Sequence, residues 1–275
     1  MRRVGLIIGV VWMTLAGGCR YEKDVPPAEI VVSNSYLYAV VRDLCGDETA
    51  IFCVVPPGMC PGHFDIRPSD VRRLYAGRVL LTFDFQQAIG GILPQDGSGP
   101  AFHTITPPAG MCIPASYLEM AQQTAEILIA EYPDRTAHFR GRLEAIGRRI
   151  AALEQECADT MQQFGLIDAP VLTSRHQAVF AEWLGMTVVA TFTGRDAETA
   201  ANINAALRQS DGSGVRWIIA NRQEGTQLAE AMADRLGAPT AVFSNFPAVF
   251  ADTLAAPAFD AMVSDNLRQL GEAAQ

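Results

Sequence analysis

The chain has 275 residues with a formal net charge of −9, and 49% of its residues are hydrophobic against 19% charged. This apolar content excludes disorder over most of the chain and suffices for two domains, each with its own core. The negative charge, without any cluster of Lys and Arg, argues against nucleic acid as a partner.

The first 19 residues predict a lipoprotein signal peptide. Arg2 and Arg3 form a short basic region, residues 4–15 are apolar but too few to span a bilayer, and small residues precede Cys19. The ending Leu-Ala-Gly-Gly-Cys resembles the bacterial lipobox, although the leucine stands four positions before the cysteine instead of three. We expect Cys19 to be lipidated and residues 20–28 to tether the protein at the outer face of a bacterial membrane, in the periplasm. The alternative is an ordinary secretory leader in which Cys19 has no role.

Short strands and helices alternate after the tether. The apolar runs at residues 30–32, 50–55 and 78–83 predict strands, and the spacing at 36–44, 69–75 and 115–131 predicts helices. Such alternation favours a parallel sheet with helices on both faces. Residues 90–110 are rich in Gly and Pro and are expected to form a loop.

Residues 135–164 form the longest helical pattern. Its apolar positions recur every three or four residues, which makes one face of the helix apolar throughout. Asp134 is a candidate N-cap, and Gly165 is expected to end the helix. Thirty residues would reach about 45 Å, enough to join two small domains. A coiled coil is the alternative, but the pattern lasts only about four heptads.

The alternation then resumes to the C-terminus. Strands are expected at 171–173, 187–193, 215–220 and 239–243, and helices at 177–184, 197–209, 225–236 and 259–270. We therefore predict an α/β protein whose two lobes have central, mostly parallel sheets and are joined by one long helix. The predicted divisions are an N-terminal lobe (29–133), a linking helix (134–165) and a C-terminal lobe (166–275).

Two histidines stand where a binding cleft is expected. His63 lies in the stretch Cys-Pro-Gly-His-Phe-Asp-Ile-Arg-Pro-Ser-Asp-Val, on a stiff loop ahead of a helix for which Ser69 is the predicted N-cap. His176 stands where a strand ends and a helix begins. In open α/β sheets, ligands bind at the carboxyl ends of strands, so both imidazoles would face a cleft between the lobes.

The stretch around His63 resembles the Asp-Pro-His … Pro-Ser-Asp-Val signature of the zinc and manganese binding proteins of bacterial ABC importers. The segment around His176 is similar to that family's Ser-His-x-Ala-Phe-x-Tyr-Phe-Ala junction, and residues 130–134 are similar to its entry into the lobe-joining helix. The resemblance covers nearly all of the mature chain. It implies a two-lobed protein that binds a metal ion with ligands from both lobes and delivers it to an ABC permease.

The chain departs from that family in its expected ligands. A third family histidine is replaced by Gly110-Met111-Cys112, and second-lobe carboxylates are replaced by Asn221 and Asn245. The losses argue against manganese, which prefers carboxylate oxygen. A set of His63, His176, Cys60 and Cys112 would suit Zn²⁺, and Met111 as a further ligand would favour copper. His103, Asn221 and Asn245 are further candidates.

The cysteines have a competing interpretation. In an oxidising compartment, Cys60 and Cys112 could form a disulfide, with Cys45 and Cys53 as a second pair. Cys157, on the apolar face of the long helix, is expected to be a buried small hydrophobic residue.

The leading hypothesis is a membrane-tethered receptor for zinc or a related transition metal, not an enzyme. One alternative is a lipoprotein of the same fold that has lost metal binding and acts in adhesion or binds an organic ligand. Another is a periplasmic metal-dependent hydrolase, which is disfavoured because the sequence has no His-Glu-x-x-His, Gly-x-Ser-x-Gly or clustered carboxylate motif.

Overall fold

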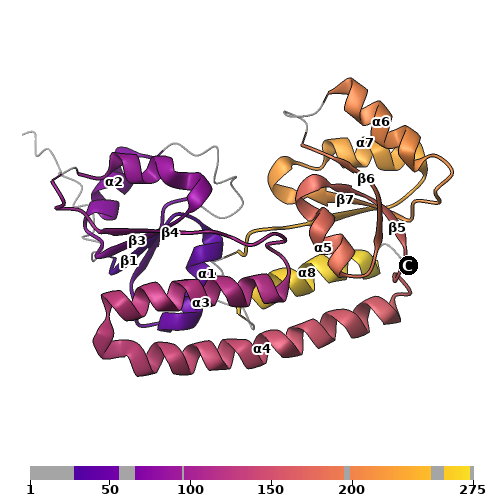
Figure 1. Cartoon of the computed structure of the whole chain (residues 1–275). Coiled ribbons are helices and arrows are strands. Elements are labelled where there is room, and N and C mark those ends of the chain that lie inside the picture. Colours follow the sequence, from indigo (N-terminus) through magenta and orange to yellow (C-terminus); the bar gives the residue numbers. More distant parts are fainter. Residues whose placement is uncertain (1–27, 56–65, 95, 195–198, 249–256, 273–275) are drawn as a thin grey trace, which may run out of the picture.

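The computed structural model of the chain describes residues 28–55, 66–94, 96–194, 199–248 and 257–272. Figure 1 shows two α/β lobes side by side, with the long helix α4 running beneath both. The predicted fold class, two lobes with parallel sheets joined by one long helix, is confirmed.

The N-terminal sheet is parallel and has the strand order β2-β1-β3-β4. Its central strands are short apolar runs that are buried along their whole length, as expected for a sheet with helices on both faces. The strands are β1 (Ile30–Val32), β2 (Ile51–Cys53), β3 (Val79–Phe83) and β4 (Ala101–Ile105). The helices of this lobe are α1 (Ser35–Cys45), α2 (Pro68–Tyr75) and α3 (Pro114–Glu131), with a 3-10 segment, η1 (Asp84–Ile92), after β3.

The C-terminal sheet is also parallel, with the order β6-β5-β7-β8. Its strands are β5 (Pro170–Ser174), β6 (Thr187–Phe192), β7 (Trp217–Asn221) and β8 (Thr240–Phe243). Its helices are α5 (Ala178–Trp183), α6 (Ala200–Ser210), α7 (Gln227–Leu236) and α8 (Ala258–Glu272). Two 3-10 turns, η3 (Arg175–Gln177) and η4 (Arg222–Glu224), directly follow β5 and β7.

The linking helix α4 (Thr136–Gln163) is amphipathic, as predicted. Its buried side chains are Phe139, Ile146, Ile150, Leu153, Cys157 and Met161. At 1.5 Å per residue its 28 residues span about 42 Å, which is enough to underlie both lobes. The prediction that Cys157 is a buried apolar residue is confirmed, since it is 1% exposed and unpaired.

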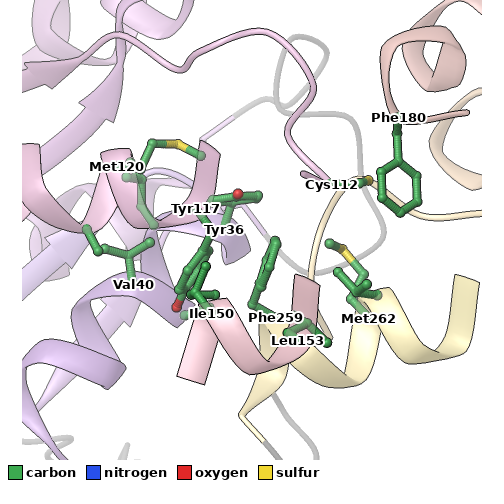
Figure 2. Close-up of a cluster of buried hydrophobic side chains, with 14 of the residues drawn as sticks. Tyr36, Val40, Cys112, Tyr117, Met120, Ile150, Leu153, Phe180, Phe259 and Met262 are labelled. Atoms are coloured by element: carbon green, nitrogen blue, oxygen red, sulfur yellow. The ribbon is translucent and has the colours of Figure 1, made fainter. Parts of the chain in front are cut away.

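The two lobes share one hydrophobic core. A single cluster of buried side chains includes residues of both sheets, α3, α4 and α8. Phe259 of α8 stacks on Tyr117 of α3 with ring centroids 4.1 Å apart, and it meets Tyr36 of α1 edge-on at 5.8 Å. Figure 2 shows these three rings packed together. The last helix of the chain therefore packs against the N-terminal lobe.

Three details differ from the sequence-based expectations. The predicted loop at 90–110 contains β4, which is delimited by Pro100 and Pro107 and pairs in register with β3. Helix α2 begins at Pro68 with Arg67 as its N-cap, so the prediction that Ser69 is the cap is wrong; proline is favoured at a first helical position because its missing N–H has no partner there.

Asp134 is likewise not the cap of α4. Pro133 starts a separate 3-10 turn, η2 (Pro133–Arg135), so Asp134 lies inside that turn and Arg135 precedes the helix. Along the described part of the chain, no helix is both long and apolar enough to cross a membrane. The predicted signal peptide, Cys19 and most of the predicted tether lie outside the described residues.

Candidate functional site

Polar side chains gather at the carboxyl ends of the C-terminal strands. Ser174 ends β5, Asn221 ends β7, and Ser244 and Asn245 directly follow β8. Because parallel strands end at the same edge of a sheet, these residues meet at one place. The two 3-10 turns add His176 and Glu224 to this edge.

The side chains of His176 and Glu224 lie side by side. His176 Nε2 is 3.5 Å from Glu224 Oε1, and the side chains are 61% and 17% exposed respectively. The other carboxylate oxygen, Oε2, accepts a hydrogen bond from Ser174 Oγ at 2.5 Å. Oε1 accepts a hydrogen bond from the backbone N–H of Gly194 at 3.0 Å. The imidazole is thus open to solvent while the carboxylate is held in place.

Next to this pair is a buried cluster of amides and one thiol. Gln177 Nε2 donates to Asn221 Oδ1 at 3.2 Å and to Asn245 Oδ1 at 2.8 Å. Cys112 Sγ lies 3.1 Å from both Asn245 Oδ1 and the backbone oxygen of Ser244, and its single S–H can donate to one of them at a time. Burial raises the pKa of the Cys112 thiol far above its usual range, so the thiol is protonated at neutral pH. A metal that bound Cys112 would have to displace this proton.

The segment that carries Cys112 is fixed to both lobes. Tyr36 OH, from α1 in the N-terminal lobe, donates to the backbone oxygen of Met111 at 2.7 Å. The next residue, Cys112, bonds to Ser244 in the C-terminal lobe. Met111 and Cys112 therefore lie where the two lobes meet.

The N-terminal sheet carries a smaller polar cluster at the corresponding edge. Ser33 Oγ and Asn34 Nδ2 donate to Gln86 Oε1 at 2.7 and 2.9 Å. Asn34 Oδ1 also accepts from the backbone N–H groups of Tyr36 and Leu37, which caps α1. The three clustered side chains are buried and neutral, so they add no charge to this edge of the N-terminal sheet.

The structure brings four of the predicted site residues to one edge. His176, Cys112, Asn221 and Asn245 all lie at the carboxyl end of the C-terminal sheet or in contact with it. The backbone oxygen of Met111 lies close to this edge, where it accepts the hydrogen bond from Tyr36 OH. The Met111 side chain packs against the shared core. His63 and Cys60 lie outside the described residues.

His103 is not brought to this edge. It lies in β4, and its Nε2 is 2.9 Å from Oε1 of Glu131, the last residue of α3. Cys112 precedes the first residue of the same helix, and 18 helical residues span about 27 Å. His103 and Cys112 are therefore at opposite ends of α3.

The described cysteines Cys45, Cys53, Cys112 and Cys157 are all free thiols. The candidate disulfide between Cys45 and Cys53 is not formed, and Cys112 carries no disulfide; its candidate partner Cys60 lies outside the described residues. Within the described ranges, no group of three or more His, Cys, Asp or Glu side chains is close enough to hold one metal ion.

Sequence reasoning missed Glu224 and Gln177. A carboxylate was expected at the end of β7, where the chain has Asn221. The 3-10 turn η4 instead brings Glu224, three positions later, to the same edge. The signal was a glutamate followed by Gly225, whose φ of 83° ends the turn in a conformation that favours glycine.

Comparisons with known proteins agree on the fold. A family model described as zinc-uptake complex component A, periplasmic (ZnuA), matches residues 113–273, more than half of the chain. A crystal structure of ZnuA is similar over 90% of this chain and 98% of its own, with 16% identity and a TM-score of 0.71. No curated protein matches by sequence.

Two further structures have comparable similarity. A manganese-bound periplasmic metal-binding protein from Candidatus Liberibacter asiaticus is 12% identical over 90% of this chain and 99% of its own, with a TM-score of 0.73. A mutant of the laminin-binding adhesin Lmb from Streptococcus agalactiae is 14% identical over 88% and 99%, with a TM-score of 0.72. At these identities the three structures establish the fold.

Proposed function

Because the chain belongs to the family of periplasmic component A proteins of zinc-uptake complexes, we propose that it captures a transition-metal ion and delivers it to an ABC permease. Zinc is the proposed cargo, with copper as the alternative. The observation that carries the proposal is the pair of His176 and Glu224 at the carboxyl edge of the C-terminal sheet, an edge that Cys112 also contacts through Ser244.

The proposed ligands are His63, His176, Cys60 and Cys112. Imidazole and thiolate are the donors that zinc accepts in tetrahedral sites. Met111 would add a soft donor and favour copper. Asn221 and Asn245 remain weaker candidates, because their amide oxygens already accept hydrogen bonds from Gln177; His103 is left out because of its contact with Glu131.

We further propose that the protein acts in the periplasm or on the outer face of a bacterial membrane. Cys19 would carry the lipid anchor, and residues 20–28 would give the lobes reach from the membrane. The proposed divisions remain 29–133, 134–165 and 166–275. The role needs no catalysis, so the protein is proposed not to be an enzyme.

The decisive experiment measures bound metal and free thiols on the same sample of full chain, purified in detergent. We expect one equivalent of zinc per chain, with much weaker binding after His63→Ala or His176→Ala. The matched control is His138→Ala, because His138 is exposed on α4 and should not touch the metal. A wild-type chain that binds no transition metal would refute the proposal.

Cobalt(II) in place of zinc tests the sulfur ligands. Thiolate ligation gives an intense charge-transfer absorption, which imidazole and carboxylate ligands do not give. We expect this absorption in the wild type and a decrease for Cys112→Ala. Cobalt binding with no such absorption would remove Cys60 and Cys112 from the ligand set.

The second candidate is a same-fold lipoprotein without metal, acting in adhesion or binding an organic ligand. It is favoured by one observation, namely that the amides of Asn221 and Asn245 stand where the family resemblance implies carboxylates and are bonded to Gln177. The stoichiometry measurement separates the two candidates. A metal-dependent hydrolase is the least favoured alternative.

A further inference from the structure

We propose that Glu224 is a metal ligand and that it forms, with His176, the C-terminal lobe's half of the metal site. The inference rests on the proposed function, because it adds a ligand to that same site. The family resemblance implies carboxylate ligands in the C-terminal lobe at the positions of Asn221 and Asn245. Glu224 would supply such a carboxylate from a different position.

The first argument is the distance between the two donor atoms. His176 Nε2 and Glu224 Oε1 are 3.5 Å apart and make no hydrogen bond, since N–H···O bonds are about 2.7–3.2 Å long. Two donors that each bind zinc at about 2.0–2.1 Å in tetrahedral geometry are about 3.4 Å apart. The pair is therefore spaced as neighbouring ligands of one ion.

The second argument is that the carboxylate is oriented by other groups. Ser174 Oγ donates to Oε2 and the Gly194 N–H donates to Oε1. Ser174 is the last residue of β5 and Gly194 lies two residues after the end of β6, and each carboxylate oxygen keeps a further lone pair. Metal sites commonly hold their ligating carboxylates by such outer hydrogen bonds, which fix the direction of the remaining lone pairs.

Gly194 has a second role, because its lack of a side chain makes room for Glu224. A Cβ atom at position 194 would lie 2.7 Å from Glu224 Cβ, closer than real side-chain atoms approach. The glycine thus lets the Glu224 carboxylate lie against the backbone of residue 194 and accept a hydrogen bond from the Gly194 N–H. Gly194→Ala should displace the carboxylate without removing any proposed ligand.

The pair also implies a class of cargo. An imidazole nitrogen with a carboxylate oxygen suits divalent ions such as Zn²⁺ and Mn²⁺, whereas Cu⁺ selects thiolate and thioether donors. Glu224 is mostly shielded and His176 is mostly exposed, so an ion can reach the imidazole first. The C-terminal half of the site should therefore favour zinc over copper(I).

The competing role for Glu224 is to orient the His176 ring without touching the metal. A carboxylate with that role would accept a hydrogen bond from the ring, but none is formed at 3.5 Å. Loss of either a ligand or an orienting partner weakens metal binding. Removing an orienting partner alone typically lowers metal affinity 10–100-fold. Affinity of one variant is therefore not enough, and a substitution that restores a ligand is needed.

The test compares zinc affinity of the full chain for the wild type, Glu224→Gln, Glu224→His and His176→Ala, by competition with a chelating dye. If Glu224 is a ligand, Glu224→Gln should bind zinc at least 10-fold more weakly, while Glu224→His supplies a new nitrogen donor and should stay closer to the wild type. The matched control is Glu230→Gln, since Glu230 is exposed on α7 and carries the same charge change.

Gly194→Ala provides an independent check, and it should weaken zinc binding although every proposed ligand is still present. Circular dichroism confirms that each variant is folded; should Glu224→Gln not fold, Gly194→Ala and Glu224→His decide the matter. If the wild type and Glu224→Gln bind zinc equally while His176→Ala binds weakly, the inference is overturned and the proposed function stands. A wild-type chain that binds copper but no zinc overturns the inference alone, and one that binds no transition metal overturns both.

Discussion

Arg149 Nε, on the linking helix, lies 3.1 Å from Asp260 Oδ2 at the start of α8, and the same guanidinium reaches Asp43 of α1. One cation thus joins helices packed on both lobes. Arg149 Nε is within ion-pair distance of Asp260 Oδ2 but makes no hydrogen bond. The other carboxylate oxygen, Asp260 Oδ1, makes no hydrogen bond either, so the pairing is incomplete.

The first prediction concerns pH. Burial, with the nearby Asp43 charge, outweighs Arg149 and raises the pKa of Asp260 from 3.8 to about 6. The folded protein therefore holds this proton more tightly than the unfolded chain, and the free energy of unfolding falls as pH rises from about 4 to about 6. The loss is at most about 3 kcal/mol for this group.

Asp260→Asn should remove this dependence. Urea unfolding at pH 5 and pH 7 should show that the wild type loses more stability between the two pH values than the variant does. All other ionisable groups are the same in the two proteins, so their contributions cancel in the comparison. Equal losses in the two proteins would show that Asp260 does not titrate in this range.

A second prediction concerns the shared core. Phe259→Ala removes a fully buried ring from its stack on Tyr117 and its edge contact with Tyr36, and should cost about 3–5 kcal/mol of unfolding free energy. Phe85→Ala is the control; its side chain is 56% exposed, and the cost should be below about 1 kcal/mol. Similar costs for the two variants would mean that the lobes do not share this core.

A third prediction concerns the thiols. Burial raises the pKa of Cys45 to about 11, and those of Cys53 and Cys157 to about 12, and it raises that of Cys112 still further. Since the thiolate is the reactive form, these four cysteines should resist a thiol reagent at pH 8 until the protein is unfolded. Peptide mapping of the labelled sites checks this, and rapid labelling of folded metal-free Cys112 would contradict its burial.

A fourth prediction separates His103 from the site. His103→Ala should leave zinc affinity unchanged, because its imidazole is bonded to Glu131 at the far end of α3. The partly exposed pair should contribute no more than about 1 kcal/mol to stability. A large loss of zinc affinity with intact folding would return His103 to the ligand set.

The fold was largely predictable from the sequence, whereas the candidate site was predictable only in part. Apolar periodicity located α4, because one face of a long helix must be buried continuously. Strand β4 was missed because this edge strand alternates between partly buried and exposed residues, with only Ile105 buried, and because its flanking prolines resemble those of a loop.

The site depends on contacts that sequence spacing does not encode. His176 was found because it directly follows a strand, but Glu224 reaches the same edge only through the 3-10 turn after β7. The bonds of Gln177 to Asn221 and Asn245 join residues more than 40 positions apart, so only the folded chain reveals that these amide oxygens are engaged.

The stack of Tyr36, Tyr117 and Phe259 has a consequence for how an ion enters and leaves. A hinge motion that separated the two lobes would expose these rings to water. The free-energy cost would be similar to that of removing a core side chain. Local movement around the exposed imidazole of His176, a proposed ligand, avoids that cost. The ring stack therefore favours a fixed spacing between the two lobes, whether or not an ion is bound.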